Sequence, residues 1–571
     1  MTSALPLNIG VTGHRDIPPH DRLALESAIA KELNDMQRRY PNTTINVLCG
    51  LAEGADQLVA NVALSQKFNV IAVLPFEVSE YQKDFRRPEA LAEFNRLLQQ
   101  CSEIKICQTN VDAPRDQGYI ALGRTLVSCA DIMFALWDGV IDMNTGIDTI
   151  TTLPGGTADV VKMCVKGIMD ESSLLFSKPN KTYCKWLVSN RTRHSILPDT
   201  ISSTSCIGTW KTLPIAGNQD DAILKDLLCK TERFNLEASF ISQQDKDKSI
   251  AYMLRSVENM SRFDSISKLI DVYSIADCLA QAGQKKRVRA LKLITVLSFL
   301  AIIAQQIYVG LYATVSWFIV HMVLVLIVIA IYRMFFVGTD SKEEQFVEWR
   351  VFAEDLRVQI FWHIAGISEH SAKNYRTTKL YEMDWIVDNL NKLMFSIPDP
   401  KSHDVEFVKK QWIVDQRNYF YGQRGERGRA AQLLTKSTQY KNLSLVFFVL
   451  AMLLMLFSAV NIQLELLTVP TNPVLFIIIA LAFISSALVN TFATQMGYEE
   501  LSQRYLRTGY FFQQALNRMT LLDMQSVQGQ EREQHLAVYQ KVIKTIGVEA
   551  LNENAAWLQL HKMNAYQIQV N

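Results

Sequence analysis

The sequence lacks any Cys-x-x-Cys pair and any cluster of cysteines with histidines, although it contains nine cysteines among 571 residues. All of the cysteines lie at or before Cys278 and are singly spaced. This pattern is typical of reduced thiols in a cytosolic domain and argues against a disulfide framework or a zinc site. We therefore expect neither a bound metal nor a cofactor.

The chain also lacks a large net charge of either sign. The 58 Lys and Arg residues against 57 Asp and Glu give a formal charge of +1, so no global basic excess points to a nucleic acid partner. The first residues, MTSALPLNIG, have no basic stretch followed by an apolar one, so we expect no secretory signal peptide. The length exceeds what one core supports and predicts two or more domains.

Four long apolar runs are present in the second half of the chain. Each is about as long as the roughly 20 residues that an α-helix needs to cross hydrocarbon. Since a buried helix of a soluble protein seldom runs so far without a charge, they predict two transmembrane hairpins. The runs are 291–312, 316–336, 443–461 and 473–493.

The basic residues that flank these runs predict their orientation. Five basic residues at 285–292 precede the first run, Arg333 closes the second, and Lys436 and Lys441 precede the third. The short connections between the paired runs contain no Lys or Arg. The excess of positive charge on the inner side of membranes then predicts that both termini and the middle region are cytosolic.

Several polar residues fall within or at the edges of the apolar runs. In hydrocarbon such side chains seek protein partners or water, so they either hold helices together or line a pore. No run carries a regular charged face of the kind an ion filter needs, and we favour contacts between helices. The residues are Gln305, Gln306, His321, Asn461, Ser485, Ser486 and Asn490.

The amino-terminal region alternates short apolar segments with helical patterns. Six strands are expected at 7–13, 45–50, 69–76, 103–108, 132–139 and 182–188. Helices are expected between them at 21–38, 55–66, 88–101, 117–130 and 157–168. This alternation predicts an α/β domain with a parallel sheet, whose ligands bind beyond the carboxyl ends of the strands.

Small and polar residues collect at those strand ends. Gly155 and Gly156 allow a close backbone approach, Thr157 is a candidate N-cap, and the helix amides that follow suit an anion. Gly54 offers a similar helix start, and His14 or Trp137 could meet a base or ribose. The predicted ligand-binding set is Thr12, Gly13, His14, Arg15, Gly50, Glu53, Gly54, Asp56, Pro75, Phe76, Trp137, Asp138, Gly139, Gly155, Gly156, Thr157 and Asp159.

Each of these features also has a simpler interpretation. A Gly-Gly-Thr turn is often only a tight connection, and Arg15 alone is often a surface cation. Glu53 and Asp56 form either a general acid–base pair or helix caps. The set gains specificity because its members occur in this order on one expected parallel sheet.

The motifs GVTGHRD, LAEGADQLVA and PGGTADVV resemble the SLOG superfamily, whose Rossmann-like domains group DNA-processing Smf proteins with Lonely Guy nucleotide phosphoribohydrolases. The resemblance covers about the first 190 residues. The remainder is similar in layout to the transmembrane effector regions joined to SLOG sensor domains in bacterial conflict systems. The resemblance implies a nucleotide-derived ligand held by the glycine loops, and anti-phage defence at the bacterial inner membrane.

One departure from the Lonely Guy enzymes concerns catalysis. Those enzymes carry PGGxGTxxE, whose glutamate serves in cleavage of an N-glycosidic bond, whereas Val160 and Val161 stand near that position here. A valine cannot move a proton, so the sequence favours binding without turnover. Asp159 is the only acid nearby.

Two functions follow as hypotheses. The first is a nucleotide second-messenger sensor that gates a membrane-disrupting or pore-forming effector, with the lipid bilayer as partner and a homo-oligomer as its assembly. The alternative is a membrane-tethered nucleotide hydrolase using Glu53, Asp56 or Asp159 with His14. A transporter is a weaker hypothesis, because the runs lack broken helices.

The expected organisation is a Rossmann-like parallel sheet domain followed by an all-α membrane region with four spans. The segment 189–221, rich in Ser, Thr and Pro, is either a lid over the ligand or a surface insertion. The expected segments are the sheet domain at 1–190, a loop and linker at 191–236, a helical connector at 237–290, the first hairpin at 291–336, cytosolic helices at 337–442, the second hairpin at 443–493 and carboxyl-terminal helices at 494–571.

Overall fold

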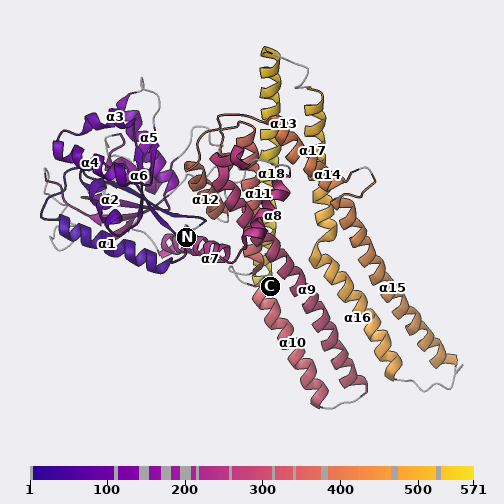
Figure 1. Cartoon of the computed structure of the whole chain (residues 1–571). Coiled ribbons are helices and arrows are strands. Elements are labelled where there is room, and N and C mark those ends of the chain that lie inside the picture. Colours follow the sequence, from indigo (N-terminus) through magenta and orange to yellow (C-terminus); the bar gives the residue numbers. More distant parts are fainter. Residues whose placement is uncertain are drawn as a thin grey trace. The chain divides into compact units, whose positions relative to one another are not determined.

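The computed structural model divides the chain into two compact units (Figure 1). The amino-terminal unit comprises Met1–Ile241, Ser265–Val272 and Ala372–Pro398. The membrane unit comprises Ser242–Asp264, Tyr273–Ser371 and Asp399–Asn571. The structure describes residues 4–107, 114–139, 154–168, 182–192, 207–213, 218–255, 260–311, 315–337, 342–374, 383–423, 425–464, 473–522 and 529–570.

The amino-terminal unit contains a seven-stranded sheet in the order β4-β3-β2-β1-β5-β6-β7. All neighbouring pairs are parallel except β6 and β7. The six strands expected from the sequence are all present, with bounds within two residues of those expected. The strands are β1 (Leu7–Gly13), β2 (Ile45–Cys49), β3 (Asn69–Leu74), β4 (Glu103–Ile106), β5 (Ile132–Trp137), β6 (Tyr183–Val188) and β7 (Trp210–Leu213).

Helices cover both faces of this sheet, which explains why its strands are apolar on both sides. Residues of one face pack against α1 (Arg22–Arg39), α2 (Ala55–Ser65), α4 (Pro88–Gln100) and α7 (Asn218–Ala238). Residues of the other face pack against α5 (Arg115–Cys129) and α6 (Thr157–Lys166). Two short elements, α3 (Val78–Tyr81) and the 3-10 helix η1 (Gln82–Asp84), follow β3.

The strand order creates a switch point between β1 and β5. From β1 the chain builds β2, β3 and β4 outward on one side, and α5 then returns it so that β5 pairs with the other side of β1. The connections leaving β1 and β5 therefore diverge from neighbouring strand ends. In open α/β sheets this divergence leaves a crevice beyond the carboxyl ends, where ligands bind.

The structure differs from the expectation of an irregular loop and linker at 191–236. Residues 210–213 form β7, which pairs antiparallel with β6, and residues 218–238 form α7. Leu224 and Leu228 of α7 are buried in the core of the sheet domain. The rest of the hypothesised lid, 193–206 and 214–217, lies outside the described residues, and the lid remains a hypothesis.

A segment that lies between the two hairpins in sequence belongs to the amino-terminal unit. Helix α12 (Asp384–Phe395) places the ammonium of Lys392 2.9 Å from the Asp131 carboxylate and 3.2 Å from the Pro6 carbonyl oxygen. The Trp385 indole donates to the Thr231 hydroxyl at 3.0 Å. Because Asp131 directly precedes β5, this helix is bound at the amino ends of the central strands.

The membrane unit is all-helical. It contains two long helical hairpins: α9 and α10 form the first, and α15 and α16 form the second (Figure 1). The helices are α8 (Gln243–Leu254), most of η4 (Met260–Ile266), most of α9 (Ser267–Gly310), α10 (Val315–Phe336), α11 (Lys342–Ile364), α13 (Val405–Val408), the π-helical segment η7 (Lys409–Val414), α14 (Asp415–Tyr421), α15 (Arg429–Leu464), α16 (Pro473–Met496), α17 (Tyr498–Thr520) and α18 (Gln530–Val570). The short helix η5 (Ser371–Asn374) lies where the chain passes back into the amino-terminal unit.

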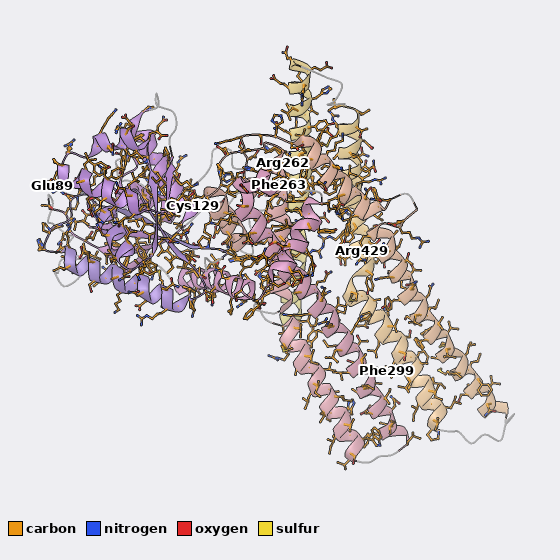
Figure 2. All side chains as sticks on the ribbon, in the orientation of Figure 1. Glu89, Cys129, Arg262, Phe263, Phe299 and Arg429 are labelled. Atoms are coloured by element: carbon orange, nitrogen blue, oxygen red, sulfur yellow. The ribbon has the colours of Figure 1, made fainter. Side chains whose placement is uncertain are left out.

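Within the part of the chain that the structure describes, four helices are long and apolar enough to cross a membrane, as the sequence predicted. Their large apolar side chains are exposed; Leu326 is 60% exposed and Leu456 is 62% exposed. In water such surfaces would be strongly unfavourable, whereas lipid tails cover them without cost. Figure 2 shows the side chains along the hairpins, with Phe299 marking the apolar part of α9.

The first span is not a separate helix. The last part of the expected connector, from Ser267, and the expected span form one continuous helix, α9, that ends at Gly310, whereas the earlier part of the connector contains the separate helix α8. Residues up to Val272 are grouped with the amino-terminal unit and those from Tyr273 with the membrane unit.

Two of the polar residues in the spans contact a neighbouring helix. The hydroxyl of Ser486 on α16 donates to the Ser444 carbonyl oxygen on α15 at 2.8 Å, and the Ser444 hydroxyl donates back to the Ser486 carbonyl at 2.9 Å. His321 Nδ1 lies 2.9 Å from the Ala301 carbonyl oxygen across the first hairpin. These contacts support the interpretation of Ser486 and His321 as links between helices.

Candidate functional site at the carboxyl ends of β1 and β5

Two glycines let β1 and α2 approach closely. A Cβ on Gly13 would lie 2.3 Å from the Cβ of Ala55, and one on Gly54 would lie 2.5 Å from the carbonyl oxygens of His14 and Arg15. Gly54 also has φ +93°, which favours glycine. The Ala55 amide donates to the His14 carbonyl at 3.0 Å. These two glycines therefore fix the position of His14 and Arg15 at the strand end.

His14 and Asp138 meet across the switch point. His14 Nε2 lies 3.1 Å from Asp138 Oδ1, and the Asp138 amide nitrogen lies 3.2 Å from the same His14 nitrogen. Both side chains are 9% exposed. Because one follows β1 and the other follows β5, the pair joins the two strands whose connections diverge. Thr12 is buried just before His14.

Tyr119 on α5 is the partner of Arg15. The Arg15 guanidinium lies 3.4 Å from the Tyr119 phenolic oxygen and 5.7 Å from the centre of its ring. The Tyr119 hydroxyl in turn donates to the Asp84 carboxylate. Arg15 itself is exposed, so its guanidinium is held in place while remaining accessible to solvent.

A second arginine completes this network. Arg115 lies 2.6 Å from the Asp84 carboxylate and 2.7 Å from that of Glu80, and its guanidinium is 4.6 Å from the centre of the Phe76 ring. The Phe76 and Tyr119 rings pack edge to face with their centres 5.5 Å apart. Phe76, which was expected to contact ligand directly, is buried and instead supports Tyr119.

The glycine turn before α6 lies against the same tyrosine. Gly155 has φ +70°, and a Cβ there would lie 2.6 Å from the Tyr119 backbone carbon. Arg15 and this turn thus contact the same residue, Arg15 at the phenol and the turn at the backbone. Amides at the start of a helix, such as those of α6, and guanidinium groups, such as that of Arg15, bind phosphate.

Details of the α6 start differ from the expectation. The N-cap is Gly156, and Thr157 is the first residue of the helix rather than its cap. Asp159 accepts a hydrogen bond from the Gly155 amide at 2.9 Å, which stabilises the turn. Val160 and Val161 are buried in the core beneath α6.

Asp56 lies buried beneath Arg15. Burial raises the pKa of the Asp56 carboxyl from its usual range to about 7, although hydrogen bonds from the Ala52 and Gly50 amides and the charge of Arg15 oppose this shift. A Cβ on Gly50 would lie 2.9 Å from Asp56 Oδ2, so glycine is needed for this arrangement. Asp56 can thus change its protonation state near neutral pH.

Other predicted site residues have structural roles. The Glu53 carboxylate forms an ion pair with Arg87. Trp137 is 3% exposed within the core, where its ring packs on Trp186, so it is not placed to meet a base or ribose. Pro75 is buried at the end of β3. Gly139 follows Asp138 with φ +73°. The start of α2 offers fewer free amides than expected, because Ala55 and Gln57 already donate to carbonyl oxygens.

Sequence reasoning missed Tyr119, Asp84 and Arg115. Tyr119 lies inside an expected helix, where an aromatic residue usually indicates core packing. Its neighbours Gly118 and Gly123 are the only available signal, since glycines within a helix mark a close approach. Among the residues that the structure describes, no group of three or more His, Cys, Asp and Glu side chains could hold a metal ion.

The comparisons with known proteins leave the family open. The chain matches no protein-family model, and no curated protein is similar to it in sequence.

Proposed function

We propose that the amino-terminal unit binds a nucleotide-derived ligand at the carboxyl ends of β1 and β5, and that binding alters the four-helix membrane region. The observation that carries this proposal is the convergence of Arg15 and the Gly155–Gly156 turn on Tyr119 at the switch point of the sheet. The guanidinium and the amides at the start of α6 are both groups that bind phosphate, and they lie at the two ends of Tyr119. The resemblance of the three motifs to SLOG domains supports a nucleotide as the source of that phosphate.

The proposed route from the site to the membrane runs through the two ends of β1 and β5. Their carboxyl ends carry His14 and Asp138, whereas their amino ends hold Lys392 of α12 through Asp131 and Pro6. In sequence α12 lies between the two hairpins, and α9 continues without a break into the first span. A ligand shifts this equilibrium only if it binds one arrangement more tightly than the other.

In the proposed mechanism the four spans act as a homo-oligomer, because four helices enclose little space for a wide pore. Ligand binding changes their packing and permeabilises the bacterial inner membrane, with both termini in the cytosol. Defence against phage through membrane disruption is the role that the SLOG-like motifs favour.

A nucleotide hydrolase is the second candidate, and one observation favours it. The pKa of Asp56 near 7 matches that of a general acid–base group at neutral pH. Against it, Asp159 is held by the Gly155 amide and Val160 is buried, so the family's usual acid has no counterpart here.

The full chain, purified in detergent micelles, tests both functions. Small molecules released on denaturation are identified by mass spectrometry, and cyclic di-AMP, cyclic di-GMP, ADP-ribose and AMP are tested for thermal stabilisation. The same probes are then added to vesicles that contain the protein and a trapped dye. We expect one nucleotide to stabilise the chain and to release the dye, without being consumed.

The outcomes separate the two candidates. Conversion of the nucleotide to base and sugar phosphate would favour the hydrolase. Neither a co-purified nucleotide nor stabilisation by any probe would contradict both. If the Arg15→Gln variant binds the nucleotide as tightly as the wild type does, the ligand does not bind beside Arg15.

A further inference from the structure

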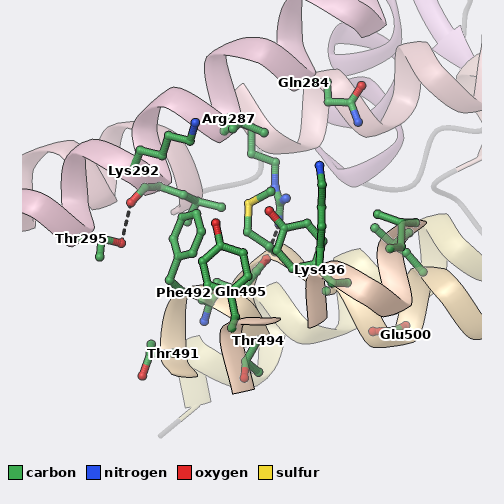
Figure 3. A pocket seen from close by; sticks show the side chains of 18 of the residues that line it. Gln284, Arg287, Lys292, Thr295, Lys436, Thr491, Phe492, Thr494, Gln495 and Glu500 are labelled. Carbon is green, nitrogen blue, oxygen red and sulfur yellow. Dashed lines mark hydrogen bonds between the residues drawn. The ribbon is translucent and has the colours of Figure 1, made fainter. Parts of the chain in front are cut away.

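A large cavity lies within the membrane unit between the two hairpins. It has a volume of about 1710 Å³ and is lined by α9, α10, α11, α15, α16 and α17 (Figure 3). Its walls include the part of α9 just before the first apolar run and the start of α15 just before the third. The cavity is therefore at the level where the spans meet the polar helices.

The lining is strongly basic. Among the described residues it contains eight Lys and Arg side chains and one acidic side chain, that of Glu500. All of the arginines but one are half-buried, and the lysines are exposed. Guanidinium groups match phosphate oxygens in pairs, whereas lysines act as point charges. The basic residues are Lys285, Arg287, Arg289, Lys292, Arg350, Arg429, Lys436 and Arg504, of which Arg289 is exposed.

The two hairpins are in direct contact along this cavity. The Arg287 guanidinium of α9 donates to the Gln495 carbonyl oxygen of α16 at 3.2 Å, which the dashed line next to Gln495 in Figure 3 marks. Lower along the spans, a Cβ on Gly310 of α9 would lie 2.8 Å from the Ile477 side chain of α16. The cavity is thus enclosed between helices that contact each other at two levels.

The lining changes from basic to apolar along the helices. Ile294 follows the basic stretch of α9, Leu443 follows Lys436 on α15, and Leu488 and Phe492 precede Gln495 on α16. Tyr332, Tyr440 and Tyr498 also line it, as is common for tyrosines at the level of lipid headgroups. A ligand that matches this lining has an anionic group at one end and hydrocarbon at the other.

We propose that this cavity binds an anionic phospholipid, with its phosphate among the arginines and lysines and its acyl chains along the apolar part of the lining. Basic pockets between transmembrane helices on the cytoplasmic side bind anionic headgroups by the same chemistry. A free phosphate would satisfy the charges but would leave the apolar walls exposed to water. The site is separate from the nucleotide site and does not depend on it.

The test uses the full chain and a pair of matched double variants. Arg429→Gln/Lys436→Gln removes one Arg and one Lys that line the cavity, whereas Arg427→Gln/Lys441→Gln removes one of each from the same stretch of chain outside it. Native mass spectrometry measures retention of phosphatidylglycerol and of phosphatidylcholine, with inorganic phosphate as a competitor. Both variants lose the same charge, so general attraction to an anionic surface affects them equally.

We expect the wild type and the control variant to retain phosphatidylglycerol in preference to phosphatidylcholine. The cavity variant should bind it about 30-fold more weakly, since each basic residue near an anionic lipid surface contributes about 1 kcal/mol. Equal weakening in both variants, or equal retention of the two lipids, would overturn the proposal. Release of the lipid by inorganic phosphate would assign the site to a free phosphate instead.

A second measurement needs no variant and remains valid if the cavity variant fails to fold. Wild-type protein in nanodiscs is treated with an amine-acylating reagent, and the labelling of Lys436 is compared with that of Lys441. We expect phosphatidylglycerol to protect Lys436 and to leave Lys441 unchanged relative to phosphatidylcholine. Equal labelling of Lys436 in the two lipids would contradict the proposal.

Discussion

His14 and Asp138 lie 3.1 Å apart across the carboxyl ends of β1 and β5, the two strands at which the sheet changes direction. The contact is formed by side chains 124 residues apart in sequence. It positions the strand end that carries Arg15, while Arg15 itself contacts Tyr119 of α5. The site is thus assembled from β1, β5, α5 and the α6 start, and each can be tested separately.

Arg15→Gln is expected to weaken nucleotide binding about 10- to 100-fold, because a hydrogen bond to a charged group contributes about 1.5 to 3 kcal/mol. Binding is measured by calorimetry with the nucleotide that stabilises the wild type. Since the Arg15 side chain is exposed, the melting temperature without ligand should change little. Arg22→Gln, at the exposed start of α1, is the matched control and should bind as the wild type does.

Asp56 should make stability depend on pH. Its folded-state pKa is raised from 3.8 to about 7, so the folded chain holds a proton that the unfolded chain has released in this range. The stability that Asp56 contributes is fully present at pH values below its pKa in the unfolded chain. It is lost as the pH rises through its pKa in the folded chain. Between pH 5 and pH 8 we expect a loss of about 2 to 3 kcal/mol relative to Asp56→Asn. Melting curves of the two proteins at each pH check this.

The same proton affects the ligand. An anion beside Arg15 repels an ionised Asp56, so a nucleotide phosphate should bind more tightly at pH 6 than at pH 8. The gain between pH 8 and pH 6 should be about fivefold if ligand binding raises the pKa of Asp56 by one further unit. Asp56→Asn should bind with equal strength at both pH values. A pH-independent affinity in the wild type would place the phosphate away from Asp56.

Much of the sheet domain was predictable because its signals are local. The six expected strands read as short apolar runs, and burial of both faces in a parallel sheet produces that pattern. The four spans were predictable for the same reason, since each depends on one continuous apolar segment. The turn at Gly155 and the strand end at His14 were also recognised, because glycine and polar residues after an apolar run indicate a turn.

The rest depends on long-range packing that no local pattern records. Strand β7 has only four residues and pairs antiparallel at the edge, and α12 lies between the hairpins in sequence but packs on the amino-terminal unit. Trp137 was predicted to contact the ligand because it ends a strand. Its side chain instead points into the core, where its ring packs on that of Trp186. Tyr119 was missed because an aromatic residue in an expected helix usually indicates core packing and not a ligand site.

Gly155→Ala should disrupt the turn that meets Tyr119. The added Cβ would lie 2.6 Å from the Tyr119 backbone, in addition to the strain of φ +70°. We expect a loss of about 2 to 4 kcal/mol of stability and a loss of nucleotide binding. Melting temperature and calorimetry measure the two effects.

Gly208→Ala is the control for Gly155→Ala. Gly208 belongs to the same unit and has φ +78°, but its added Cβ would come no closer than 3.4 Å to another atom. It should lose only the backbone strain, about 1 kcal/mol, and should keep its ligand affinity. Equal losses of stability and of ligand affinity in the two variants would show that backbone strain alone, without the contact with Tyr119, explains the effect of Gly155→Ala.

The reciprocal hydrogen bonds between Ser444 and Ser486 should stabilise the second hairpin modestly. Interhelical hydrogen bonds in membranes contribute about 0.6 kcal/mol on average and about 1.7 kcal/mol at most. The two hydroxyl oxygens also lie 3.0 Å from each other, and a double-mutant cycle of Ser444→Ala and Ser486→Ala, measured by unfolding in detergent, isolates this contact and should give a coupling energy in this range. Additive effects of the two substitutions would show that the hydroxyls do not interact.

Lys392 tests whether the amino ends of β1 and β5 communicate with the membrane helices. Its ammonium and the Asp131 carboxylate are 3% and 10% exposed, so Lys392→Met leaves a buried carboxylate without its cation. We expect the free energy of unfolding to fall by about 3 to 5 kcal/mol, and Asp131→Asn in the same chain to restore part of it. The double variant Lys392→Met/Asp131→Asn is therefore the informative protein. It should bind the nucleotide as the wild type does, because Arg15 and Tyr119 are unchanged, but it should release less dye from vesicles. Dye release equal to the wild type would exclude α12 from the path between ligand and membrane.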